Sequence, residues 1–403
     1  MIRCAVMRLL LVLILGGLAA GAGPMTKLFD GKTLRGWRQC NGKASYSVVK
    51  GAIVGTTAEG SPNSFLCTEK TYGDFVLEYE IWAEDVLNSG VQIRSHQYAA
   101  ETTVRTFNGK EGVVRKQPAG RVYGYQVETA NEASGDSGGI YDEGRRGWLH
   151  HTSSRALKAG QWNKYRVEAI GDHIRVWVNG EACADVVDPL DQEGFIALQV
   201  HSFKGDKPAS VRWRNLMIED RGRHVWKPVV AEWEKNGGGE WTFDGGVITG
   251  RQTVDSLKRR LLILKESWTD FTLRLEYKTV AGNSGVFFRM GDPDKGTEPN
   301  RMGFEIEVDP TRDAGGLQEP GRQARGWIQH TGPLDGLWFF KPGDWNEMTI
   351  SAHGGRIAVF INGVKTGELV GDTAGRKMGR LALQANPRQN LEVHYRGLAV
   401  LGR

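Results

Sequence analysis

The feature that most constrains this sequence is an internal repeat. The stretch NSGVQIRS begins at Asn88, and the closely similar NSGVFFRM begins at Asn283. Further blocks recur in the same order: GYQVET with GFEIEV, GGIYDEGRRGWLHHT with GGLQEPGRQARGWIQHT, GQWNKYRVEAIGDHIRVWVNGEA with GDWNEMTISAHGGRIAVFINGVK, and GFIALQVH with GRLALQAN. The offset between copies drifts from about 177 to about 195 residues, as expected when loops vary in length and strands do not. The chain is therefore a tandem duplication.

The duplication predicts two domains after an export signal. With 403 residues, the chain exceeds what one core usually organises. We expect a first domain over residues 24–220, a linker over 221–232 and a second domain over 233–403. In residues 1–23, Arg3 and Arg8 precede an apolar run from Leu9 to Leu15 and then small residues, which is the layout of a cleaved signal peptide. An uncleaved anchor is the alternative, but the run is shorter than the roughly 20 residues that span a bilayer. We therefore expect a secreted or periplasmic protein with no membrane attachment after cleavage.

Alternating hydrophobicity predicts that each copy is nearly all strand. Phe75, Leu77, Tyr79 and Ile81 alternate with residues of the opposite face, and no long stretch has helical spacing. A run of alternating apolar residues followed by Asn-Gly, typical of a β-hairpin, ends at Asn179 and recurs in the second copy. The predicted fold class is all-β, with two tandem β-sandwiches of packed antiparallel sheets.

The same alternation predicts a polar face in each copy. Three repeated strands each present apolar residues on one side and planar, multiply hydrogen-bonding residues on the other, a mixture that suits sugar hydroxyls. An ordinary solvated surface is the alternative, in which Arg94 and Arg289 simply pair with Glu128 and Glu307 across neighbouring strands. The predicted polar-face residues are Gln92, Arg94, Gln126, Glu128, Gln199 and His201 in the first copy and Arg289, Glu305, Glu307, Gln384 and Asn386 in the second.

A loop in each copy adds further candidates at the rim of this face. Tyr141, Trp148 and His151 are candidate substrate-binding residues, although packing is the alternative role for the two larger rings. His150 precedes His151 and could reach the same rim. The intervening residues 142–146 are expected to form a local salt-linked turn.

The repeated blocks resemble a known family. LFDGKTLRGW from Leu28, NSGVQIRS, GGIYDE, GQWNKYRV, VNGE and ALQVH are similar to motifs of the 3-keto-disaccharide hydrolase domain family. The resemblance covers both copies, except that the second lacks LFDGKTL at its start. It implies a concanavalin A-like β-sandwich of the jelly-roll type, and it implies action on glycosides whose C3 hydroxyl has been oxidised to a ketone.

Such a substrate assigns chemistry to the polar face. A C3 ketone acidifies the C2 proton, so a general base can form an enolate that expels the C1 substituent, after which water adds. We expect Glu128 and His201 to supply the base and acid, with Arg94 stabilising the enolate oxygen. A divalent metal held by a His–Glu–His set is an open alternative for that last role.

The two copies differ at these positions. Asn386 replaces His201, and an amide cannot act as an acid or base near neutral pH. Glu305 replaces Gln126, and the family motif has Glu at the Glu305 position and Gln at the Glu307 position. The difference between His201 and Asn386 favours the first copy as the active one. The match of Glu305 to the family motif favours the second copy.

Composition excludes some partners and leaves two alternative functions open. The net charge of +5 includes two arginines of the signal segment, and no basic stripe suggests nucleic acid. Cys40, Cys67 and Cys183 remain after signal cleavage, so at most one disulfide forms. A carbohydrate partner is expected, and the oligomeric state is not predicted. The alternatives are a non-catalytic, lectin-like binding protein and a retaining β-glucanase, although the usual Glu-x-Asp-x-x-Glu order is missing.

Overall fold

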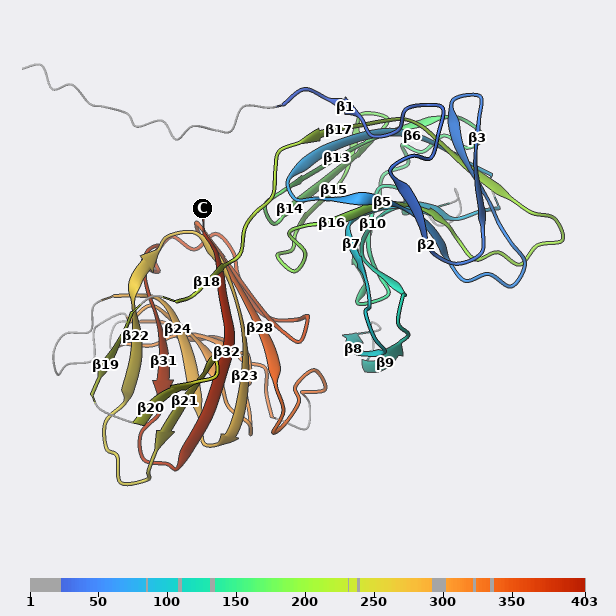
Figure 1. Cartoon of the computed structure of the whole chain (residues 1–403). Coiled ribbons are helices and arrows are strands. Elements are labelled where there is room, and N and C mark those ends of the chain that lie inside the picture. The colour runs from blue at the N-terminus through green and yellow to red at the C-terminus, as the bar shows by residue number, and fades with distance from the viewer. Residues whose placement is uncertain are drawn as a thin grey trace, which may run out of the picture.

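The computed structural model contains strands and no helix in the part of the chain that it describes (Figure 1). It describes residues 23–84, 86–107, 111–130, 135–230, 232–237, 240–291, 302–321, 324–333 and 337–402. The predicted signal segment therefore lies almost entirely outside the described residues. No helix within these ranges is long and apolar enough to cross a membrane. The all-β fold class predicted from the sequence is confirmed.

The first domain is a sandwich of two antiparallel sheets. We call them the back sheet, with order β15-β14-β13-β6-β17-β4-β3 and β1 added beside β17, and the front sheet, with order β12-β11-β10-β7-β16-β5-β2. A separate hairpin is formed by β8 and β9. The strands are β1 (Thr26–Lys27), β2 (Trp37–Asn41), β3 (Ser45–Val49), β4 (Ala52–Thr56), β5 (Ser64–Tyr72), β6 (Phe75–Ala83), β7 (Ser89–Gln97), β8 (Thr102–Phe107), β9 (Gly112–Gln117), β10 (Val122–Thr129), β11 (Ile140–Glu143), β12 (Gly147–His150), β13 (Asn163–Ile170), β14 (His173–Val178), β15 (Glu181–Val187), β16 (Gly194–Val200) and β17 (Ser210–Asp220).

The second domain repeats the strand order of both sheets. Its back sheet has the order β30-β29-β28-β23-β32-β21-β20, with β18 beside β32, and its front sheet has the order β27-β26-β25-β24-β31-β22-β19. Part of the expected linker, β18, thus pairs within the second sandwich. The strands are β18 (Lys227–Pro228), β19 (Trp233–Asn236), β20 (Glu240–Asp244), β21 (Val247–Gln252), β22 (Arg260–Trp268), β23 (Phe271–Ala281), β24 (Ser284–Met290), β25 (Phe304–Val308), β26 (Leu317–Glu319), β27 (Gly326–Gln329), β28 (Asn346–His353), β29 (Arg356–Ile361), β30 (Val364–Leu369), β31 (Gly379–Ala385) and β32 (Leu391–Gly402).

Alternation along the front strands builds the core and the polar face together. In the first domain, Val91 of β7 lies opposite Val127 of β10 and Leu198 of β16, and all three are fully buried between the sheets. One residue along, Gln92 lies opposite Gln126 on the other face of the same sheet. Because side chains alternate between faces, burying the first set fixes where the second set points.

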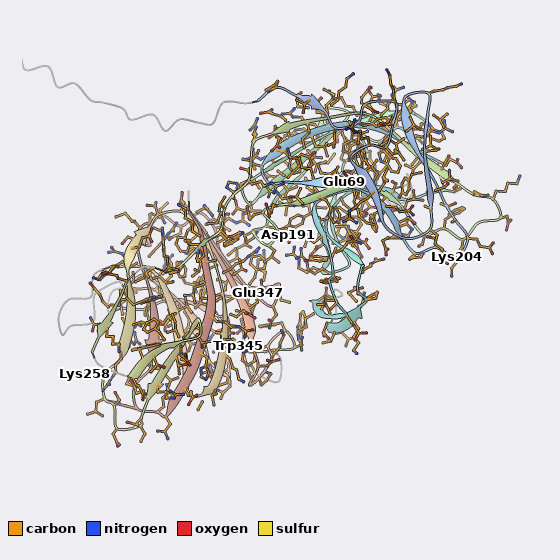
Figure 2. All side chains as sticks on the ribbon, viewed as in Figure 1. Glu69, Asp191, Lys204, Lys258, Trp345 and Glu347 are labelled. Carbon is orange, nitrogen blue, oxygen red and sulfur yellow. A yellow bond between two sulfur atoms is a disulfide. The ribbon has the colours of Figure 1, made fainter. Side chains whose placement is uncertain are left out.

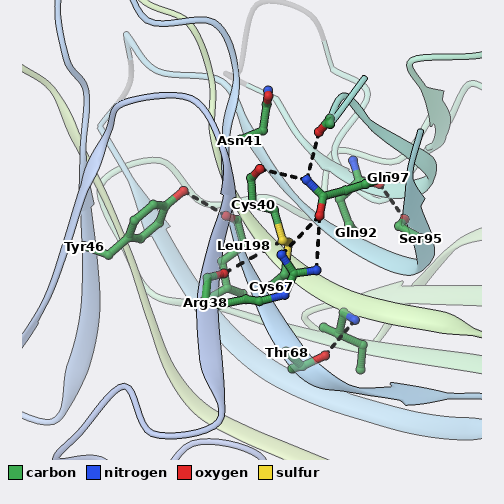
Figure 3. The surroundings of a disulfide bond; sticks show 12 residues. Arg38, Cys40, Asn41, Tyr46, Cys67, Thr68, Gln92, Ser95, Gln97 and Leu198 are labelled. Atoms are coloured by element: carbon green, nitrogen blue, oxygen red, sulfur yellow. Dashed lines mark hydrogen bonds between the residues drawn. A yellow bond between two sulfur atoms is a disulfide. The ribbon is translucent and has the colours of Figure 1, made fainter. Parts of the chain in front are cut away.

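A disulfide closes one edge of the front sheet in the first domain (Figure 3). Cys40 of β2 is bonded to Cys67 of β5, the pairing that the sequence left open, and Cys183 is a buried free thiol. Beside the disulfide, the Arg38 guanidinium donates to the side-chain oxygen of Gln97 at 3.1 Å, and the Gln97 amide donates to the Cys40 carbonyl oxygen at 2.8 Å. These bonds join the edge strand β2 to the end of β7.

Loops of the first domain contact the outer face of the back sheet of the second domain. Ser351 donates from its hydroxyl to the carboxylate of Asp172 at 3.1 Å, and Leu190 packs against Ala358 and Phe360. Between the domains lies a groove of about 390 Å3, lined in part by Asp191 and Glu347, which are labelled in Figure 2.

Candidate functional site

The floor of the candidate site is a lattice of glutamine side chains on the outer face of the first front sheet. Gln92, Gln126 and Gln199 come from three adjacent strands, β7, β10 and β16. The Gln92 and Gln199 amides both donate to the side-chain oxygen of Gln126 at 2.7 Å. All three are almost completely buried, but the side-chain oxygen of Gln199 has no hydrogen-bond partner. A buried acceptor without a partner usually indicates a place for water or a ligand hydroxyl.

Glu128 lies at the end of this lattice and is the principal ionisable group of the floor. The Gln126 amide donates to one of its carboxylate oxygens at 2.7 Å, and the Asn88 amide donates to the other. Glu128 is only 4% exposed, and this burial raises the pKa of its carboxyl group to about 7. The two amide donors favour the charged form but do not offset the effect of burial. A carboxyl group with a pKa near 7 can exchange a proton at neutral pH, as a general base requires.

A second group of side chains surrounds Glu143 at the rim. Burial raises the pKa of Glu143, and its charge is stabilised by Arg121, His201 and Asn63. The Arg121 guanidinium is paired with Glu143, and its Nε atom is buried without a hydrogen-bond partner. His201 places its Nδ1 atom 2.8 Å from the Ser202 carbonyl oxygen, so Nδ1 carries a proton and Nε2 is left for other partners.

Tyr141 links the floor and the rim electrostatically. It lies opposite Gln126 in the pairing of β10 with β11, on the same face as the lattice. Burial raises its pKa, and the negative charges of both Glu128 and Glu143 raise it further. The polar face of the first domain therefore gathers two carboxyl groups, a phenol, a guanidinium and an imidazole.

Arg94 does not belong to this gathering, and the expectation that it projects from the polar face beside Glu128 was wrong. Its φ of 46° breaks the alternation of β7. The side chain therefore points towards the loops at one end of the sandwich. There it donates to the carbonyl oxygens of Gly73 and Ala169 at 2.8 and 3.0 Å and pairs with Asp74 at 2.9 Å. The alternative expectation of a pair with Glu128 was wrong as well, since the partner is Asp74.

Arg289 repeats this arrangement in the second domain. Its φ is 48°, and it pairs with Asp270 at 3.3 Å rather than with Glu307. Its guanidinium also donates to the carbonyl oxygens of Thr269 and Gly354 at 2.9 Å. The repeated arginine therefore ties the two sheets together at one end of each sandwich.

Trp148 lies on the edge strand β12, and His151 lies in the loop that follows it. The His151 ring stacks on the Trp148 ring, with 4.4 Å between centroids, and Trp148 meets Tyr141 edge-on at 5.3 Å. The expected salt-linked turn is also present, because Arg145 and Arg146 both pair with the buried carboxylate of Asp142.

The polar face of the second domain has the same strand pairing as the first but carries several different side chains. Phe287 stands opposite Glu305 where Gln92 stands opposite Gln126, and it packs in an apolar cluster with Met302 and Ile263. Burial raises the pKa of Glu305 to about 8 and that of Glu307 to about 7.

Amides surround the second carboxyl group of this face. Asn283 and Gln318 donate to the Glu307 carboxylate, Gln318 at 2.9 Å. Asn386 donates to the side-chain oxygen of Asn283 at 2.9 Å, and the side-chain oxygen of Gln384 has no partner, as in Gln199. The predicted polar-face residues of the second domain, apart from Arg289, thus lie together.

Sequence reasoning missed Asn88, Asn63, Arg121 and Glu143. Glu143 had a detectable signal, because alternation through IYDE places it on the face of Tyr141, but it was assigned to the salt-linked turn. Arg121 and Asn63 lie just outside strands, where no periodicity indicates direction. In the second domain, Pro320 occupies the position of Glu143 in the repeat and cannot carry a charge.

A metal site does not emerge from the described residues. Among them, no three His, Cys, Asp or Glu side chains gather closely enough to hold an ion. The alternative of a His–Glu–His set is not assembled among them, since His151 bonds Asp136 and His201 faces Glu143.

Comparisons with solved structures give likenesses that each span about one domain. A proposed glycosyl hydrolase from Parabacteroides distasonis is 19% identical, covers 49% of this chain and 93% of its own, and has a TM-score of 0.34. The carbohydrate-binding module CBM66 from Bacillus subtilis is 16% identical, covers 46% and 96%, and has a TM-score of 0.32. A protein with a galectin-like fold from Bacillus subtilis is 10% identical, covers 46% and 90%, and has a TM-score of 0.35. No curated protein matches the chain.

The family comparison is more extensive. The model of the 3-keto-alpha-glucoside-1,2-lyase-like domain matches residues 24–219 and again residues 226–401. The two matches follow the two sandwiches and the duplication seen in the sequence. The chain therefore belongs to the family of the 3-keto-alpha-glucoside-1,2-lyase-like domain, in two tandem copies.

Proposed function

We propose that the first domain cleaves glycosides that carry a ketone at C3. The observation that carries this proposal is Glu128, a buried carboxyl group whose pKa is raised to about 7 and which ends a lattice of amides. Family membership and the polar face support a carbohydrate-active protein. The finer assignment of the substrate rests on matching this carboxyl group to the acidic C2 proton.

The proposed reaction uses the groups of the face in sequence. The Glu128 carboxylate takes the C2 proton, and the electron pair of the C–H bond becomes an enolate on the C3 oxygen. The enolate electrons then re-form the ketone and build the C1–C2 double bond as the C1–O bond breaks. His201 in its protonated form gives a proton to the leaving oxygen. Addition of water across the double bond gives the 3-keto sugar.

The enolate oxygen needs a positive or hydrogen-bonding partner. Arg94 is not placed to supply it, because its guanidinium donates to the carbonyl oxygens of Gly73 and Ala169 at the end of the sandwich. We assign this role to Arg121, whose Nε donor is buried without a partner at the rim. A guanidinium that is already held in place stabilises developing negative charge without reorganisation at the moment of reaction.

The test compares 3-keto-glycosides with their unoxidised parents. The purified protein should release the C1 substituent from a 3-keto-α- or 3-keto-β-glucoside and leave both parent glucosides intact, with and without a chelator. Binding of the glycosides without release from any of them would leave the non-catalytic, lectin-like function. Cleavage of unmodified β-glucan would instead favour the retaining glucanase.

Export is part of the same proposal. The layout of residues 1–23 and the disulfide between Cys40 and Cys67 both favour an oxidising compartment outside the cytoplasm. Cell fractionation and N-terminal sequencing of the mature protein test it. Recovery of uncleaved protein from the cytoplasm would contradict it.

A further inference from the structure

One arrangement outside the proposed catalytic groups is repeated in both domains with almost the same geometry. His151 stacks on Trp148 at 4.4 Å and 30°, and His330 stacks on Trp327 at 4.2 Å and 26°. Each imidazole places Nδ1 beside an aspartate, at 3.1 Å from Asp136 and 3.2 Å from Asp313. We call each set a Trp–His–Asp unit.

Each unit is fixed to the strand that carries the floor carboxyl group. In the first domain, the Gly139 amide donates to the Asp136 carbonyl oxygen at 2.9 Å, and the Glu128 amide donates to the Gly139 carbonyl oxygen at 3.0 Å. In the second, Gly316 donates to Asp313 at 2.8 Å, and Glu307 donates to Gly316 at 2.9 Å. The unit therefore lies at the edge of the polar face in both domains.

Glycine at these positions lets the indole lie close to the backbone. A Cβ atom added at Gly139 would lie 3.2 Å from the Trp148 ring, and one at Gly316 would lie 2.9 Å from the Trp327 ring. Each ring is held between this backbone, the histidine and its neighbours. A rigid aromatic surface loses little conformational entropy when a ligand binds to it.

Both units nevertheless remain open to solvent. Trp148 is 37% exposed and Trp327 is 39% exposed, although indole is among the side chains that gain most from burial. The aspartate holds the proton on Nδ1, so Nε2 is the hydrogen-bonding atom that remains, and it has no partner among the described residues. An exposed apolar ring beside a directed polar atom is the combination that a sugar ring matches, with its C–H face and its hydroxyl groups.

The divergence of the two domains makes the repetition informative. His201 became Asn386 and Glu143 became Pro320, yet the tryptophan, histidine, aspartate and paired glycines are identical in both copies. The units need neither residue of the proposed chemistry, so they can serve binding alone. We propose that each Trp–His–Asp unit binds one pyranose ring of a glycan and that the second domain binds without cleaving.

This inference rests on the proposed function only for the class of ligand. Two binding units on one chain make the protein bivalent, so a polymeric glycan should bind more tightly than either unit alone would allow. Small 3-keto-glycosides reach one domain at a time and should be cleaved equally well without the second unit.

Affinity electrophoresis in native gels that contain soluble starch, dextran or barley β-glucan tests the inference. The full chain should be retarded in at least one gel. Trp327→Ala and Trp148→Ala should each weaken the apparent affinity by about threefold to tenfold, as expected for loss of one aromatic contact, and the double variant should run unretarded. Trp345→Ala, which removes a partly exposed indole on the back sheet, is the matched control and should behave as the unaltered protein.

The outcomes separate this inference from the proposed function. Trp327→Ala should keep its turnover of a small 3-keto-glucoside while losing retardation. His330→Gln is the second variant, in case the tryptophan variant fails to fold, and thermal unfolding checks both. An unretarded native protein in all three gels, or unchanged retardation of the double variant, overturns the inference whatever the turnover. Retardation that follows the tryptophans without any turnover overturns only the proposed function.

Discussion

The front sheets of the two domains have the same strand order and the same inward-turned arginine, but they differ in several side chains of the polar face. In the first domain, three glutamines join into a lattice that ends at Glu128. In the second, Phe287 occupies the place of Gln92 and forms an apolar cluster with Met302. The backbone fold therefore does not determine the chemistry of the face, which depends on a few outward side chains that can change without disturbing the core.

The carboxyl groups sharpen this contrast. Glu128 has a raised pKa in a polar setting with orphaned donors and acceptors around it, whereas Glu305 has a raised pKa beneath apolar side chains. A proton-transfer group needs room for a substrate as well as a suitable pKa. Both faces keep an unpaired glutamine oxygen, at Gln199 and at Gln384, but in the second domain the apolar cluster around Phe287 and Met302 takes the place of part of the glutamine lattice.

The largest expected effect comes from the floor carboxyl groups. Glu128→Gln should lower kcat for a 3-keto-glucoside by about a thousandfold, because an amide cannot take the C2 proton. Glu307→Gln, the same change at the equivalent position, should leave kcat within about twofold if only the first domain turns over. Steady-state kinetics of the two variants measures this contrast. The reverse pattern would assign the chemistry to the second domain.

The pH dependence of the reaction should report the same carboxyl group. Burial raises the pKa of Glu128 to about 7, so the group is protonated and inactive as a base below that pH. We expect kcat/KM to fall about tenfold for each pH unit below 7, or about a hundredfold at pH 5. Initial rates across the range in which the protein stays folded check this. A profile that is level through pH 7 would remove Glu128 as the base.

Sequence reasoning predicted the duplication, the sandwich fold and most of the polar face because these depend on regular alternation. Gln92, Gln126, Glu128 and Gln199 lie where a period of two places them. It failed at Arg94, where a positive φ reverses the direction of one side chain within an otherwise regular strand. No residue type in NSGVQIRS announces that reversal, since arginine is not a residue that favours positive φ.

The rim was harder to predict than the floor. Arg121 and Asn63 approach Glu143 from loops, and their meeting depends on the curvature of the whole sheet rather than on local sequence. The disulfide between Cys40 and Cys67 was an open pairing for the same reason. Regular strands therefore give the direction of a side chain, and only the folded sheet gives its distant neighbours.

The inward-turned arginines should differ in their contribution to stability. Arg94→Ala breaks the pair with Asp74, whose side chain is 14% exposed and keeps His224 at 2.8 Å, and it removes a donor from the buried carbonyl oxygens of Gly73 and Ala169. We expect a loss of about 3–5 kcal/mol in the free energy of unfolding of the first domain. Arg289→Ala should cost less in the second domain, because Asp270 is 38% exposed and can be solvated. Calorimetric unfolding of both variants compares them, and equal losses would contradict the burial argument.

Exchanging the rim residue that differs between the domains should give a moderate effect. His201→Asn copies the second domain and removes the proton donor for the leaving oxygen, so kcat should fall about tenfold to a hundredfold for substrates with poor leaving groups. Substrates with an acidic leaving group, such as a nitrophenol, need no such proton and should be nearly unaffected. Equal losses for both substrate types would indicate a binding role for His201. Asn386→His in the second domain is the matched control and should change neither rate.

The smallest effect concerns the carboxyl group that the second domain has in place of Gln126. Burial raises the pKa of Glu305 from 4.5 to about 8, so the folded domain holds a proton that the unfolded chain releases above about pH 4.5. The stability of the second domain should therefore decrease as the pH rises from 4.5 towards 8, and then level off. Glu305→Gln removes this dependence and should stabilise the domain at pH 8, with almost no gain at pH 4. Unfolding curves at the two pH values measure the difference. A gain of the same size at both would mean that improved packing against Phe287 and Met302, rather than the relief of a buried charge, separates the two faces.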